Sequence, residues 1–144
     1  MKFDHIGVVV RSLELGRTHL REALGIDDWT TEFLDDNIGV AVQFGRDSSL
    51  ITYELVAPLR DTSPVSRALK AGVNVINHVA YLVADLDMEA RRLKDLGFIA
   101  TGPAVEAVAY GNSRIQFFVS DLFMLIELIE APLHRHVFRT TPEN

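Results

Sequence analysis

Two histidines and two glutamates stand in stretches of sequence that are otherwise apolar: His5, Glu54, His78 and Glu127. Burying a polar or charged side chain is costly unless it has a partner, so these positions are informative. Two imidazoles and two carboxylates suit a borderline or hard divalent cation, such as Zn, Co, Ni, Mn or Fe(II). Four protein ligands in an octahedral sphere leave two positions for water or substrate oxygens. The set therefore predicts one catalytic metal site.

The same residue types recur at a constant spacing, which indicates an internal duplication. The pairs separated by 73 residues (78 − 5, 127 − 54 and 116 − 43) are His5 with His78, Glu54 with Glu127, and Gln43 with Gln116. One such histidine or glutamate alone would more often be structural. Symmetry between two halves would bring both histidines and both glutamates toward one axis. For the two glutamines a structural role is favoured over contact with a ligand.

Each half of the chain follows a βαβββ pattern. In module one (residues 1–59) the pattern predicts a strand at 3–10, a helix carrying Leu13, Leu20 and Leu24, and strands near 29–33, 38–44 and 49–56. In module two (75–131) the pattern predicts a strand at 76–83, a helix carrying Leu86, Ala90 and Leu93, and strands near 99–101, 114–119 and 123–129. Residues 106–112 fit either a strand or a loop.

The linking segment at 60–74 predicts a helix near 64–71, with Ser63 as the N-cap, Pro64 in the first turn and Gly72 as the stop. Residues 132–144 show no clear pattern, and we expect a loose tail there. The fold class is then α+β. Residues 1–131 form a single domain of two tandem βαβββ modules, closed into a curved, partly closed mixed β-barrel with the helices outside. The concave cavity of such a barrel is lined by both halves.

Composition narrows the functional classes. The 144 residues are 48% hydrophobic and 24% charged, which suits one compact domain. The net charge of −6 argues against nucleic acid as the main partner. The sequence has no cysteine, no signal-peptide pattern and no apolar run of membrane-spanning length. We expect a cytoplasmic protein whose partner is a small molecule, without membrane or nucleic-acid binding.

The duplicated pattern with its four polar residues resembles the vicinal oxygen chelate superfamily, which includes glyoxalase I, bleomycin resistance proteins and extradiol dioxygenases. Within it, the chain is most similar to the methylmalonyl-CoA epimerase family. The segments that carry this likeness are Phe3-Asp4-His5-Ile6-Gly7-Val8-Val9-Val10, Glu54-Leu55-Val56-Ala57-Pro58-Leu59, Ser63-Pro64-Val65, Ile76-Asn77-His78-Val79-Ala80 and Leu125-Ile126-Glu127-Leu128.

The resemblance implies that His5, Glu54, His78 and Glu127 bind one divalent metal ion, for which Zn, Co, Ni and Mn are candidates. It implies proton transfer at a carbon next to a carbonyl, with Glu127 as the first candidate base and Glu54 for the opposite face. The substrate would be an acyl-CoA or a thiol adduct, and the protein a homodimer.

Two alternatives stay open. A glyoxalase I-like lyase acting on a hemithioacetal uses the same ligand set. A non-catalytic binding or resistance protein would hold a small molecule in the same cavity. The stretch Phe118-Val119-Ser120-Asp121-Leu122-Phe123-Met124 lacks the His-Pro-Lys segment that epimerases usually carry, which keeps both alternatives in view.

Overall fold

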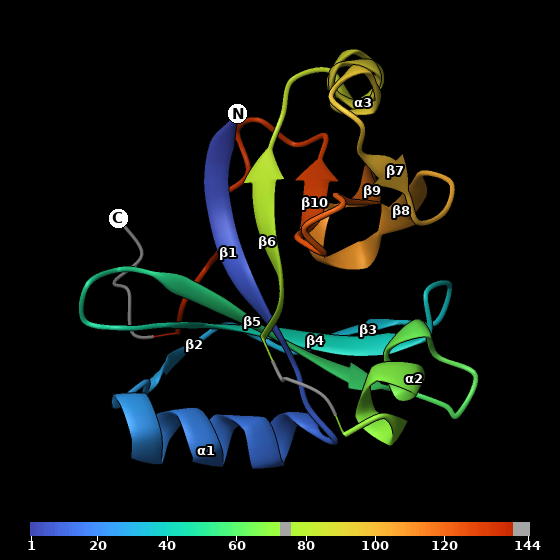
Figure 1. Cartoon of the computed structure of the whole chain (residues 1–144). Coiled ribbons are helices and arrows are strands. Elements are labelled where there is room, and N and C mark those ends of the chain that lie inside the picture. Colours follow the sequence, from blue (N-terminus) through green and yellow to red (C-terminus); the bar gives the residue numbers. More distant parts are fainter. Residues whose placement is uncertain (73–75, 140–144) are drawn as a thin grey trace. The chain divides into compact units, whose positions relative to one another are not determined.

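The computed structural model describes residues 1–72 and 76–139 (Figure 1). These residues form two compact units. The N-terminal unit holds residues 5–72 and 76–77 together with the C-terminal segment from Arg135. The C-terminal unit holds Met1–Asp4 and His78–His134. Among the described residues, no helix is long and apolar enough to cross a membrane.

The N-terminal unit follows the first predicted βαβββ module. Its elements are β1 (Lys2–Val9, from His5 onward), α1 (Leu13–Leu24), β2 (Asp28–Trp29), β3 (Phe33–Asp35), β4 (Val40–Arg46) and β5 (Thr52–Pro58), followed by α2 (Pro64–Lys70). The strands lie in the order β2-β4-β5-β1, and β3 also pairs with β4. β1 and β5 are parallel, while the other pairs are antiparallel.

α1 is fixed at both ends by its own sequence. Ser12 accepts a hydrogen bond from Leu15 N at 3.2 Å, and Gly25 ends the helix in the left-handed conformation with φ 68°. Its buried residues, Leu13 among them, pack against one face of the sheet, where Leu55 is fully buried. That packing leaves the opposite face of β4 and β5 for other side chains.

The C-terminal unit repeats this arrangement. Its elements are β6 (Ile76–Leu82, from His78 onward), α3 (Leu86–Asp95), β7 (Ile99–Ala100), β8 (Val105–Ala107), the 3-10 turn η1 (Val108–Tyr110), β9 (Ser113–Val119) and β10 (Leu125–Ile129). The strands lie in the order β6-β10-β9-β7, and β8 also pairs with β9. The parallel pair is again formed by the first and last strands of the module, β6 and β10. The predicted α+β class and the duplication are therefore confirmed.

Several predicted boundaries shift where side chains replace backbone hydrogen bonds. The single strand expected at 29–33 is two short strands, because the Thr30 hydroxyl accepts from Phe44 N at 3.2 Å and interrupts the ladder. The strand expected at 49–56 begins at Thr52, because Asp47 Oδ1 accepts from Ser49 N and Ile51 N in a preceding turn. Ser63 stands at the N-cap of α2, but its side chain makes no capping hydrogen bond.

The C-terminal segment does not hang loose from the fold between Arg135 and Arg139. Phe138 is buried, with 5% of its surface exposed, and the Arg46 guanidinium carbon lies 4.3 Å from the centre of its ring. Arg139 N donates to Trp29 O at 3.0 Å. This part of the expected loose tail is therefore packed on the N-terminal unit, and the prediction of looseness is wrong there.

The two units differ in how the helix-covered face is filled. In the N-terminal unit the Trp29 ring lies over Gly45, so close that a Cβ at Gly45 would fall 2.5 Å from a ring carbon. The positions 73 residues later are Gly102 and Phe118, so the large and small residues have exchanged places. The Trp29 ring of the N-terminal unit therefore has no counterpart at position 102 of the C-terminal unit.

Replacing Gly45 with alanine should destabilise the protein by about 1–3 kcal/mol, because the Trp29 ring must move to admit the methyl group. Gly102→Ala is the matched control, since a Cβ there meets no atom within 4 Å. Urea unfolding followed by tryptophan fluorescence measures both changes. Equal midpoints for the two variants would contradict this account of the packing.

Glu130 ties α3 to the sheet. Its Oε1 accepts from Leu86 N at 3.0 Å, and its carboxylate pairs with Arg114, whose Nε lies 2.9 Å from Oε2. The Arg114 hydrogen bonds, followed by the Leu86 bond, lower the pKa of Glu130 below its ordinary value. The stabilisation that the ionised Glu130 gives the folded protein is therefore complete at pH values above the ordinary pKa of glutamate. It is lost as the pH falls through the lowered pKa of Glu130.

Glu130→Gln should accordingly lower the melting temperature at pH 7, and the difference from the wild type should shrink as the pH falls below about 4. Glu22→Gln, at an exposed position on α1, is the control for the substitution itself. Calorimetry across pH 3–8 checks the trend. A difference that grows toward acid would show that the sign assigned to this pair is wrong.

Candidate metal centre

The first pair of predicted ligands comes together in the N-terminal unit. His5 Nε2 lies 3.2 Å from Glu54 Oε2, and the side chains are 0% and 8% exposed. Gly7 on β1 is the register partner of Glu54 on β5, and His5 lies two residues before Gly7 on the same face. Because glycine fills no space there, the imidazole of His5 can reach the carboxylate. Phe44, the β4 partner of Glu54, packs its ring edge-on at 5.5 Å from His5.

The second pair lies in the C-terminal unit and repeats this geometry. His78 Nε2 lies 3.1 Å from Glu127 Oε2, with both side chains 3% exposed. Ala80, the residue 73 positions after Gly7, is the register partner of Glu127. Phe117, 73 positions after Phe44, packs its ring at 90° and 5.1 Å from His78. The structure therefore places the four predicted ligands as two matched pairs, one in each unit.

Each pair has the donor spacing that a shared cation requires. Ligand atoms bound at about 2.1 Å in adjacent octahedral positions are about 3.0 Å apart, since this distance is 2.1 Å multiplied by the square root of two. The observed separations of 3.2 and 3.1 Å fit that value. The donors are one imidazole nitrogen and one carboxylate oxygen in each pair, a combination that suits zinc and its first-row neighbours. The residues present therefore fit a divalent metal ion.

The repeated glutamines lie on the opposite, helix-covered faces. Gln43 accepts from Arg17 Nη1 at 2.6 Å and donates to Thr30 O at 2.8 Å. Gln116 donates to Gly102 O at 2.9 Å. Both therefore hold helix-side loops or side chains in place, in agreement with the structural interpretation of this repeat.

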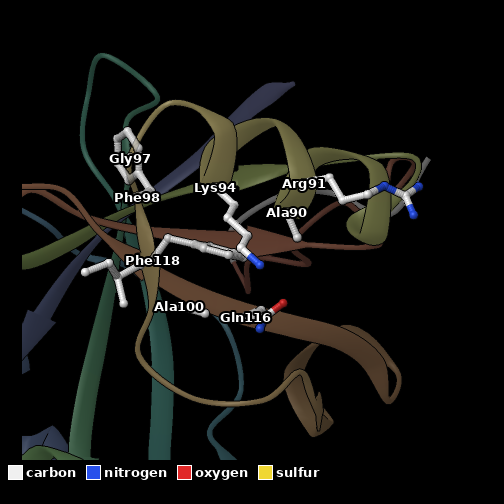
Figure 2. A pocket seen from close by; sticks show the side chains of 9 residues that line it. Ala90, Arg91, Lys94, Gly97, Phe98, Ala100, Gln116 and Phe118 are labelled. Atoms are coloured by element: carbon white, nitrogen blue, oxygen red, sulfur yellow. The ribbon is translucent and has the colours of Figure 1, made fainter.

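Gln116 also lines a groove of about 550 Å³ between α3, β7 and β9 (Figure 2). The groove lies where the N-terminal unit has Arg17 and Trp29, because the residues 73 positions later are Ala90 and Gly102. Lys94 reaches over its apolar floor, whereas Arg91 points away. This groove belongs to the helix side of the sheet, away from the face that carries Glu127.

One residue near the first pair has no counterpart in the sequence pattern. His136 comes from the C-terminal segment and stacks on Phe44 with ring centres 4.0 Å apart. It lies in the stretch 132–144, which shows no clear pattern in the sequence. His19 on α1 is exposed.

Comparison with known proteins identifies the superfamily. The family model described as glyoxalase/bleomycin resistance protein/dioxygenase superfamily matches residues 4–118. No curated protein sequence matches the chain.

Solved structures share the fold. A methylmalonyl-CoA epimerase from Mycobacterium tuberculosis is 29% identical, with a TM-score of 0.73 over 89% of this chain and 86% of the other. A hypothetical protein from Bacillus halodurans is 21% identical, with a TM-score of 0.78 over 94% and 98%. A Streptomyces coelicolor methylmalonyl-CoA epimerase in complex with 2-nitronate-propionyl-CoA is 23% identical, with a TM-score of 0.73 over 90% and 96%. The chain belongs to the glyoxalase/bleomycin resistance protein/dioxygenase superfamily.

Proposed function

We propose that the two histidine–glutamate pairs share one divalent ion, ligated by His5, Glu54, His78 and Glu127, and that the protein is a metal-dependent enzyme. The observation that carries this proposal is the matched geometry of the pairs. Each is buried, each holds an imidazole nitrogen 3.1–3.2 Å from a carboxylate oxygen, and each recurs at the same offset. Zn, Co, Ni or Mn would suit these donors.

The reaction that we propose is proton transfer at a carbon next to a carbonyl group. When bound, the cation would polarise the carbonyl oxygen and so lower the pKa of the neighbouring C–H group. The Glu127 carboxylate removes that proton, and the electron pair of the broken C–H bond moves toward the carbonyl carbon and oxygen. Return of a proton to the opposite face of the carbon, with Glu54 on that side, inverts the centre.

The substrate that we propose is an acyl-CoA of the methylmalonyl-CoA type, which makes the enzyme an epimerase. Support comes from the epimerases among the similar structures, of which the Mycobacterium tuberculosis enzyme is 29% identical. A glyoxalase I-like lyase uses the same donors on a hemithioacetal. Exchange of the substrate α-proton in D₂O, followed by NMR with methylmalonyl-CoA and separately with a methylglyoxal–thiol adduct, distinguishes the two reactions.

We also propose that the protein is a homodimer. Three large apolar side chains of the C-terminal unit are strongly exposed in the single chain: Leu122 at 84%, Phe123 at 89% and Leu133 at 91%. Exposed apolar residues of this size are typical of surfaces that associate. Light scattering after size-exclusion chromatography measures the mass directly.

Glu127→Gln should reduce turnover on the order of 10²–10⁴-fold, because the amide cannot accept the substrate proton. It should also weaken metal binding, since one anionic donor is lost. Glu106→Gln, an exposed glutamate of the same unit, is the matched control and should keep both properties. Steady-state kinetics and Co²⁺ titration report the two effects separately. Normal turnover in Glu127→Gln would sink the assignment of the base.

Removing the metal should lower the melting temperature, because an ion that binds only the folded protein stabilises it by mass action. Elemental analysis of the purified protein should find about one divalent ion per site. EDTA should lower the melting temperature by several degrees, and adding Zn²⁺ or Co²⁺ should restore it. A metal-free protein with an unchanged melting temperature would instead favour a non-catalytic small-molecule binder.

A further inference from the structure

The groove of about 550 Å³ on the helix side of the C-terminal unit lies outside the candidate metal centre. Its lining comes from α3, β7, β9 and the turn before β7, and includes Ala90, Lys94, Phe98, Ala100, Gln116 and Phe118 (Figure 2). Phe117 on β9 is the register partner of Glu127, so its neighbours Gln116 and Phe118 point to the opposite face of the sheet. A groove of this volume with an apolar floor suits a small organic ligand.

Lys94 is the cation that reaches over this floor (Figure 2). Within the part of the chain that the structure describes, it forms no ion pair. The other cations of this unit differ: Arg92 Nε lies 2.7 Å from Glu89 Oε2, and Arg114 Nε lies 2.9 Å from Glu130 Oε2. A cation that stands beside apolar surface without a fixed carboxylate attracts an anion from solution.

The duplication shows which group Lys94 lacks. Arg21, 73 residues before Lys94, pairs with Asp27, whose Oδ1 lies 2.6 Å from Arg21 Nε. Asp27 immediately precedes β2, whereas Phe98 immediately precedes β7. The residue 73 positions after Asp27 is Ala100. Either match places an apolar side chain where the N-terminal unit has a carboxylate, so the second unit keeps the cation without its anionic partner.

A second difference between the units opens the space beside Lys94. In the N-terminal unit Arg17 Nη1 donates to Gln43 Oε1 at 2.6 Å, whereas the residue 73 positions after Arg17 is Ala90. Gln116 Nε2 donates to Gly102 O at 2.9 Å, and no described residue donates to its Oε1. The groove therefore contains an unused acceptor next to an unpaired cation.

We infer that this groove is a second ligand site, which binds a small aromatic carboxylate. The carboxylate pairs with Lys94 Nζ, in the role that Asp27 has for Arg21. The ring lies on the apolar floor formed by Phe98 and Phe118, where aromatic contacts add to the burial of apolar surface. The four candidate metal ligands take no part, so the inference stands independently of the proposed function.

Phenylacetate is the probe, and its binding to the full-length protein as purified is followed by ¹H–¹⁵N NMR. The amides of α3 and β7 and the side-chain amide of Gln116 should shift, with a dissociation constant on the order of 1 mM for a ligand of this size. Phenylacetamide, which has no charge, should bind about two- to fivefold more weakly, as expected for the loss of an exposed ion pair. Shifts confined to the strands around the metal ligands, or equal affinity for the two probes, would overturn the inference.

Lys94→Met removes the charge and keeps the apolar stem of the side chain. The dissociation constant for phenylacetate should rise about two- to fivefold, while that for phenylacetamide should not change, because the two losses are one interaction. Arg91→Met is the matched control, since Arg91 belongs to the same helix and points away from the floor. Equal losses in the two variants, or wild-type affinity in Lys94→Met, would contradict the role of Lys94.

Ala90→Leu tests the place of binding by filling the groove, and it should weaken the binding of both probes. Met88→Leu, at an exposed position on α3 that does not line the groove, should bind them as the wild type does. Wild-type affinity in Ala90→Leu would overturn the inference. Shifts of the same groove amides when the protein is diluted without any probe would assign the groove to a second copy of the chain, and would overturn it equally.

Discussion

Each unit buries one imidazole against one carboxylate, and this contact constrains the residues around it. Taking such groups out of water costs several kcal/mol per ion, which is offset only by close contact and further ligands. The contact depends on the parallel register of the first and last strands of each module, in which Glu54 faces Gly7 and Glu127 faces Ala80. A larger residue at position 7 or 80 would stand between histidine and glutamate. The small residue at position 7 or 80, the strand register and the histidine–glutamate contact therefore depend on one another.

One set of differences between the two modules lies on the helix side of each sheet, away from the buried pair. On the helix side, Arg17 secures Gln43, whereas the corresponding position in the second module is Ala90, and the groove beside Gln116 opens. Trp29 fills the space over Gly45, whereas Phe118 provides the ring in the second module. Neither change touches the strand residues that hold the carboxylates. Packing on the helix side can thus vary while the histidine and glutamate of each pair keep the same contact.

The constant offset of 73 residues was enough to single out the four residues, and the strand register that the duplication repeats explains why they lie as two pairs. What the sequence did not reveal depends on contacts that leave no periodic trace. The Thr30 hydroxyl divides one predicted strand by bonding to Phe44 N, a residue 14 positions away. His136 follows no pattern, since its place on Phe44 is set by the distant anchor of Phe138 on Arg46. Such features need the tertiary structure.

The C-terminal segment makes the two buried glutamates inequivalent. The face that carries Glu54 has a stacked pair of rings, Phe44 and His136, whereas Phe117 alone is the corresponding ring contact described beside His78. The two pairs therefore share one donor geometry but differ in the rings beside them, because the C-terminal segment supplies its ring to the N-terminal unit.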